Sequence, residues 1–227
     1  FESLRQETFN WLKQQDLAIF FFKIGLMDNS PIGMAIAPAN AGFFAMGLAM
    51  LQKIVRFDEI PPGTEIYATV YVAPPFRHTH FGGKQVVVHN RLDHQYEIFS
   101  YNLYPGPSAK KGIYGVLLTI GEEEGWATTH CSAVESVSPY DNITRFMHEG
   151  ASGGGKSEML QHIVREPSGE VLIGINSVTG EKRTIQIPRF CEIRPVCDDM
   201  ATVHPSVQTE SKRLRLLDGE NSWFIRT

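Results

Sequence analysis

The sequence predicts an α/β protein of the mixed α+β kind, in which an N-terminal α/β region precedes a second region. Apolar residues recur at helical spacing over residues 1–16. Farther along, short runs of β-branched and aromatic residues are bounded by proline and glycine, which is typical of strands. A glycine-rich segment at residues 150–157 then lies between a predicted strand and a predicted helix. That order of elements is the one that phosphate binding needs.

The individual elements follow from the same patterns. Helices are predicted over residues 1–16 and 41–55, and residues 157–164 are predicted as the first turns of another helix. The apolar stretch 35–51 contains Pro38 and Asn40 and favours a loop followed by a buried helix. Residues 110–119 form an apolar run of undetermined type. Strands are predicted at residues 20–26, 66–72, 85–88, 96–101 and 142–148, with a hairpin at 171–175 and 183–187.

Composition sets limits on the class of protein. The 227 residues carry a net charge of −4, so no basic field draws in nucleic acid or an anionic membrane. The apolar segment near the N-terminus is interrupted by Lys23 before it can span a bilayer. Three cysteines do not suit a secreted disulfide scaffold, and we therefore expect a cytoplasmic protein. Because the sequence begins with Phe1, we expect it to be part of a longer chain.

The glycine-rich segment carries the strongest signal for function. It fits G-x-x-x-x-G-K-S/T, in which backbone N–H groups surround the phosphates of a nucleotide. The lysine reaches the β- and γ-phosphates, and the final hydroxyl binds Mg²⁺. The alternative is a glycine-rich turn that happens to end in Lys-Ser. The predicted nucleotide-binding residues are Gly150, Ser152, Gly153, Gly154, Gly155, Lys156 and Ser157.

A phosphate loop needs an acidic partner to hold its metal. Asp198 and Asp199 follow an apolar stretch that begins at Ile193. Hard divalent cations prefer carboxylate oxygens at such a strand end. Without the loop, these two residues would indicate only an exposed turn. With the loop, the sequence favours a metal site.

Four segments in order resemble the phosphoenolpyruvate carboxykinases, chiefly the ATP-dependent type. Residues 110–114 (KKGIY), 129–133 (THCSA), 150–157 (GASGGGKS) and 198–199 (DD) resemble the family's M-K-K-G-M-F, M-H-C-S-A, G-x-S-G-x-G-K-T and G-D-D. The resemblance covers about residues 108–227. It implies an N-terminal α/β substrate-side region at 1–127 and, at 128–227, a phosphate-loop nucleotide- and metal-binding domain with a mixed sheet, which we expect to be incomplete at its C-terminus.

The resemblance also implies a metal- and ATP-dependent enzyme acting on a small carboxylate such as oxaloacetate. Lys111, His130 and Asp199 would bind Mn²⁺, while Asp198 and Ser157 would lie at the Mg²⁺ of the nucleotide. A lysine ligates a metal only when neutral, which requires a depressed pKa. Lys111, Lys156 and Asp198 would take part in catalysis. Arg77 would grip the substrate carboxylate, although a surface arginine on a loop explains it equally well.

Some features depart from that family and keep other functions open. Glu158 follows Ser157, so the loop also resembles that of HPr kinase/phosphorylase. We therefore expect the protein to belong to a separate bacterial branch of the carboxykinase-like proteins. The stretch between the loop and Asp198 is much longer than in carboxykinases. A kinase of another small molecule or of a protein hydroxyl is therefore an alternative, as is a nucleotide-binding regulatory module without catalysis. ATP in place of GTP rests on the resemblance alone, and the sequence does not indicate an oligomeric state.

Two further candidates are weaker. His78 and His80 would share one face of a strand and offer two metal ligands, but no third ligand lies at a recognisable spacing. Cys131 has no base beside it in the sequence, so we expect a buried neighbour of His130 in place of a nucleophile.

Overall fold

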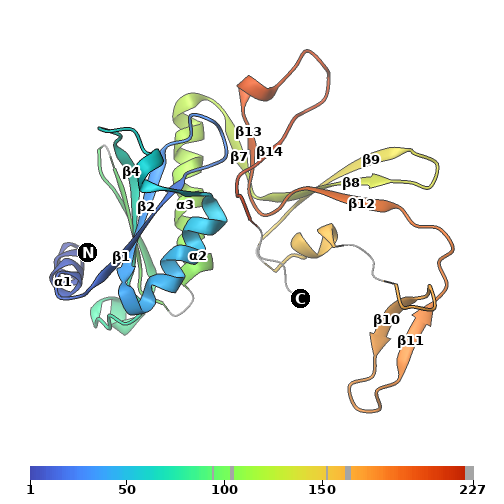
Figure 1. The fold of residues 1–227 in the computed structure, drawn as a ribbon, viewed down its shortest axis with the longest axis horizontal. Helices are drawn as coiled ribbons and strands as arrows, with labels where there is room; N and C mark the ends of the chain where they lie inside the picture. The colour runs from blue at the N-terminus through green and yellow to red at the C-terminus, as the bar shows by residue number, and fades with distance from the viewer. Residues whose placement is uncertain (94, 103–104, 152, 162–164, 223–227) are drawn as a thin grey trace. The chain divides into compact units, whose positions relative to one another are not determined.

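A computed structural model describes residues 1–93, 95–102, 105–151, 153–161 and 165–222, and it divides them into two compact units (Figure 1). Unit 1 comprises residues 1–128 and 202–222, and unit 2 comprises residues 129–201. The region predicted as 128–227 therefore contains a C-terminal stretch that lies in unit 1. The coarse fold prediction is confirmed, because the protein is a mixed α+β structure with several sheets and few helices.

Unit 1 is built on a six-stranded mixed sheet of order β3-β1-β2-β4-β6-β5. The pairs β2–β4 and β4–β6 are parallel, while β1–β2, β1–β3 and β5–β6 are antiparallel. The central strands are rich in β-branched, aromatic and small apolar residues, which suits a sheet covered on both faces. The strands are β1 (Leu17–Lys23), β2 (Ile32–Pro38), β3 (Ile54–Val55), β4 (Ile66–Val72), β5 (Val87–Arg91) and β6 (Tyr96–Ser100).

Helices lie on both faces of this sheet (Figure 1). On one face, α1 (Glu2–Leu12) buries Leu4 against Phe99 and Tyr101. On the other face lie α2 (Gly42–Gln52) and α3 (Pro105–Glu124). The contact between α3 and β6 requires a glycine, because a Cβ atom at Gly112 would lie 2.8 Å from Ile98. Among the described residues, we find no helix with the length and apolar character needed to cross a bilayer.

The C-terminal stretch returns to unit 1 through a small sheet and a buried ion pair. This sheet has the order β14-β13-β7, with β7 (Ala127–Thr129), β13 (Ala201–Val203) and β14 (Leu217–Asp218). Just beyond β14, the buried carboxylate of Glu220 lies 2.7 Å from Lys110 Nζ on α3. Gln52 Nε2 donates to the same carboxylate at 3.3 Å. The stretch is thus held against the last residue of α2 and the second turn of α3.

Unit 2 contains a three-stranded antiparallel sheet of order β12-β8-β9 and a separate hairpin. The sheet strands are β8 (Cys131–Val137), β9 (Ile143–Glu149) and β12 (Glu192–Cys197). The hairpin pairs β10 (Val171–Ile175) with β11 (Lys182–Ile185), as the sequence predicts. Among the described residues, the 3-10 helices are η1 (Ala39–Ala41), η2 (Phe57–Glu59), η3 (His80–Gly83), η4 (Ser157–Leu160) and η5 (Pro205–Val207).

Two element predictions are wrong. Residues 32–38 form the strand β2, where a loop was expected for the first part of 35–51. An apolar run of this length does not distinguish a strand covered on both faces from a buried helix. The helix expected from Ser157 is only the single turn η4, because Gln161 takes extended angles of φ −76° and ψ 139°. The remainder of that predicted helix, residues 162–164, lies outside the described residues.

A buried carboxylate joins α1 to the sheet and makes part of the stability of unit 1 dependent on pH. Glu97, whose side chain is 5% exposed, accepts two hydrogen bonds from Arg5, at 2.7 and 2.8 Å, and one from Asn90 at 2.7 Å. Burial raises the pKa of Glu97, but the hydrogen bonds from Arg5 and Asn90 outweigh burial and hold the pKa below its usual value.

We expect Glu97→Gln to lower the free energy of unfolding at pH 7 by about 2 kcal/mol. Because the folded pKa lies below the unfolded one, this contribution is fully present above the unfolded pKa and is lost as the pH falls through the folded pKa. Glu2→Gln is the matched control, since Glu2 also pairs with Arg5 but its side chain is 74% exposed. Chemical denaturation from pH 7 to pH 3 measures both, and a pH-independent difference would contradict the assignment.

Candidate functional site

The strand register of unit 2 brings three segments to one edge of its sheet. β8 lies between β9 and β12 and is antiparallel to both, so its first residues face the last residues of its neighbours. Cys131 pairs with Glu149 at the end of β9, and Ala133 pairs with Cys197 at the end of β12. His130, the glycine-rich loop and the Asp198–Asp199 turn therefore begin at the same edge.

The loop has the backbone that its glycines predict. Gly153 and Gly155 have φ values of +82° and +83°, in the left-handed region that residues with a Cβ atom rarely occupy. A Cβ atom at Gly154 would lie 3.0 Å from the carbonyl oxygen of Ala151, which accepts a hydrogen bond from the Gly154 N–H. Ser152, predicted to bind nucleotide, lies outside the described residues.

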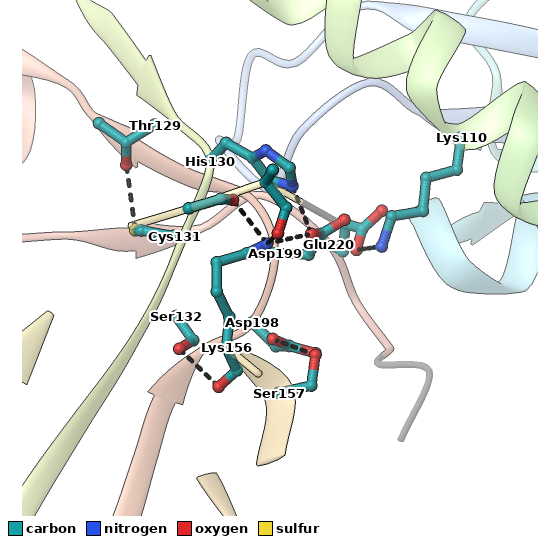
Figure 2. A network of polar contacts seen from close by, with 12 residues as sticks. Lys110, Thr129, His130, Cys131, Ser132, Lys156, Ser157, Asp198, Asp199 and Glu220 are labelled. Atoms are coloured by element: carbon teal, nitrogen blue, oxygen red, sulfur yellow. Dashed lines mark hydrogen bonds and ion pairs between the residues drawn. The ribbon is translucent and has the colours of Figure 1, made fainter. Parts of the chain in front are cut away.

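Lys156 is held at both its backbone and its side chain (Figure 2). The buried hydroxyl of Ser132 on β8 donates to the carbonyl oxygen of Lys156 at 2.8 Å. The Lys156 side chain is 6% exposed, and its Nζ donates to the carbonyl oxygens of Gly150 at 2.9 Å and Ala151 at 3.3 Å. The same Nζ lies 3.6 Å from Oδ1 of Asp199.

Both aspartates face residues of the loop (Figure 2). Ser157 Oγ donates to Oδ1 of the buried Asp198 at 3.0 Å. Asp199 has a φ of +62°, a left-handed conformation that aspartate tolerates better than most residues. The Met200 N–H bonds to the carbonyl oxygen of Asp198 at 2.7 Å and closes the turn. This tight turn places two adjacent carboxylates beside the lysine and hydroxyl of one loop.

His130 completes the cluster. Its Nε2 lies 2.7 Å from Oδ1 of Asp199, so imidazole and carboxylate are hydrogen-bonded to each other. Nitrogen and hard oxygen suit Mn²⁺, and two ligands of one small cation lie about 3 Å apart, close to this spacing. Within the described ranges, however, no group of three or more histidine, cysteine, aspartate or glutamate side chains is placed to hold a metal ion. The residues of unit 2 thus fit two positions of a coordination sphere.

The structure gathers five predicted residues of unit 2 and places two others in unit 1. His130, Lys156, Ser157, Asp198 and Asp199 form the cluster just described. Lys111 is part of α3, with its Nζ 6.0 Å from the centroid of the Tyr114 ring. Arg77 is exposed in the loop that follows β4.

The weaker histidine candidate has other partners. Nε2 of His80 lies 3.0 Å from the Glu7 carboxylate, and the His78 and His80 rings are 6.0 Å apart. His78 is buried mainly among aromatic rings, which lowers its pKa. Neither histidine belongs to a three-ligand group within the described residues.

Two side chains have roles that the sequence analysis missed. Ser132 was part of a quoted motif but received no function. The sequence does mark this serine, because it is a polar residue between Cys131 and Ala133 in a strand that is otherwise apolar at its start. The sequence indicates a role for Lys111 and none for Lys110. Of these two lysines, Lys110 is the buried one, and it forms the ion pair with Glu220. Cys131 is buried, as expected.

The chain belongs to the family described as a domain of unknown function (DUF4914), whose model matches residues 1–227. No curated protein matches the sequence. That family description names no activity.

We expect Ser132→Ala to loosen the loop, because it removes a buried donor from the Lys156 carbonyl oxygen. The free energy of unfolding should fall by about 1–2 kcal/mol, and amide exchange at residues 153–161 should become faster. Ser136→Ala, a half-buried serine on the same strand, is the matched control and should change both by much less. Equal effects of the two variants would show that Ser132 has no special relation to the loop.

Proposed function

We propose that this protein is an ATP- and divalent-metal-dependent phosphoryl-transfer enzyme of the phosphoenolpyruvate carboxykinase type, acting on a small carboxylate such as oxaloacetate. One observation carries the proposal: the lysine and the serine of the phosphate loop each face one of two adjacent aspartates. Lys156 faces Asp199 at 3.6 Å, and Ser157 faces Asp198 at 3.0 Å. A glycine-rich turn without function has no need of this pairing.

The chemistry follows from these positions. Phosphoryl transfer depends on positioning and on stabilising the charge of the equatorial oxygens more than on covalent catalysis. The loop amides and Lys156 would hold and neutralise the phosphates. Gly153 and Gly155 would let the backbone approach them closely.

Divalent cations would complete the site. When bound, Mn²⁺ and Mg²⁺ would act as Lewis acids on the enolate oxygen and on the transferring phosphoryl group. His130 and Asp199 offer ligands to the first, and Ser157 and Asp198 to the second. The family resemblance adds Lys111 to the Mn²⁺ ligands and Arg77 to the substrate carboxylate.

A kinase acting on a different small molecule or on a protein hydroxyl is the second candidate. It is favoured by Glu158 after the loop and by the hairpin β10–β11, which occupies the long segment between the loop and Asp198. A regulatory module that only binds nucleotide is less well supported, because binding alone does not call for the His130–Asp199 pair.

Lys156→Ala should weaken ATP binding in the presence of Mg²⁺ by at least about tenfold, the effect of a charge-assisted contact of about 1.4 kcal/mol or more. Calorimetry on the full-length protein measures it, with GTP titrated in parallel. Lys182→Ala on β11, which removes an exposed lysine paired with Glu166, is the matched control. Unchanged ATP affinity in Lys156→Ala would exclude a phosphate-binding loop.

The substrate is tested with oxaloacetate, ATP, Mg²⁺ and Mn²⁺, and phosphoenolpyruvate is the product measured. We expect product from the wild-type protein and a loss of kcat of at least about 100-fold in Lys111→Ala, the size of effect seen when one group that stabilises developing charge is removed. ATP binding without product would exclude the carboxykinase reaction and favour the second candidate.

A further inference from the structure

The ammonium group of Lys156, the lysine of the phosphate loop, is bound by acceptors of the protein itself. Its Nζ makes hydrogen bonds to Gly150 and Ala151 and an ion pair with Asp199. An ammonium group has three N–H donors, and three protein acceptors surround this one. A nucleotide that needs Lys156 at its β- and γ-phosphates has to replace at least part of this arrangement.

One oxygen of Asp199 is shared. Oδ1 lies 2.7 Å from His130 Nε2 and 3.6 Å from Lys156 Nζ, so the same carboxylate oxygen faces both side chains. The side chain of Asp199 is 16% exposed, so these interactions are screened less than those of a surface pair. The carboxylate that would ligate a cation with His130 is therefore the one that neutralises the loop lysine.

We propose that Asp199 couples cation binding to nucleotide binding by exchanging Lys156 for a divalent cation. This inference rests on the proposed function, since it concerns the same nucleotide and cation sites. Without the cation, the ion pair with Asp199 adds to the two carbonyl hydrogen bonds that hold Lys156 against the loop. A cation bound by Asp199 and His130 takes up the carboxylate charge and leaves Lys156 available for phosphate.

The sign of the coupling follows from charge. A cation at Asp199 leaves the buried Lys156 ammonium without its carboxylate partner, and a polyphosphate then supplies the missing negative charge. Coupling between two binding sites is reciprocal, so nucleotide should raise cation affinity by the same factor. Coupling factors of about 5- to 150-fold are usual, and we expect about tenfold here.

The first experiment compares ATP binding in EDTA, by calorimetry, for wild-type protein and Asp199→Asn. The variant removes the carboxylate charge but keeps the size of the side chain. We expect it to bind metal-free ATP about tenfold more tightly than the wild type. Glu149→Gln is the matched control, because it removes one exposed negative charge directly before the loop and should change the affinity little.

The outcomes separate the inference from the proposed function. Wild-type protein that fails to bind ATP in Mg²⁺ would overturn the function itself. Wild-type protein that binds ATP in Mg²⁺, with Asp199→Asn no tighter than wild type in EDTA, would overturn the coupling alone. An equal gain in Glu149→Gln would also overturn it, since a general change in charge would then suffice.

A second experiment needs no variant and no nucleotide. Wild-type protein is treated with an acetylating reagent, with and without Mn²⁺, and the acetylation rate of Lys156 is followed by mass spectrometry. We expect Mn²⁺ to raise this rate about tenfold. Exposed Lys182 on β11 serves as the internal control, whose rate should not change. An unchanged rate at Lys156 would overturn the proposal.

Discussion

The contact between His130 and Asp199 depends on two strand pairings, and the rest of the site depends on that contact. His130 lies between β7 and β8, and Asp199 lies between β12 and β13. β7 is a neighbour of β13 in one sheet, and β8 is a neighbour of β12 in the other. Two connections held at both ends by paired strands have to run close together. Residues 69 positions apart are therefore adjacent, with their polar atoms at 2.7 Å.

The glycine-rich loop is brought to His130 and Asp199 by β9, the third strand of the unit 2 sheet. β9 ends at Glu149, opposite the start of β8, and the glycine-rich segment follows at once. Ser132, one residue into β8, then fixes the carbonyl oxygen of Lys156. The site needs backbone conformations that most residues avoid, at Gly153, Gly155 and Asp199. Such conformations persist where the surroundings hold them, and they gather at functional sites.

The sequence predicted the parts of this site better than their assembly. Local patterns located the strand before the loop, the hairpin and the glycines, because these depend on nearby residues. They failed at β2, which is apolar on both faces, and at η4, which stops after one turn. Neither spacing nor composition indicates that β12 lies beside β8, because antiparallel pairing across a long insertion leaves no periodic signal. The roles of Ser132 and Glu220 likewise depend on tertiary contacts, with the carbonyl oxygen of Lys156 and with the side chain of Lys110.

Each of two buried lysines forms an ion pair with a carboxylate. The Lys110–Glu220 pair suits a structural role, whereas the Lys156–Asp199 pair suits the exchange of the lysine for a cation. Lys110 and Glu220 are 7% and 0% exposed, and Gln52 also bonds the carboxylate, so separating the pair would leave a charge enclosed in unit 1. Lys156 is buried to a similar degree, but its partner Asp199 is more open and divides its charge between Lys156 and His130. A cation can approach Asp199 from solvent and replace Lys156 as the partner of its carboxylate, while a polyphosphate supplies negative charge to the lysine. The two ion pairs therefore differ in the exposure of the carboxylate and not in that of the lysine. The more exposed carboxylate, Asp199, is the one that can exchange its partner.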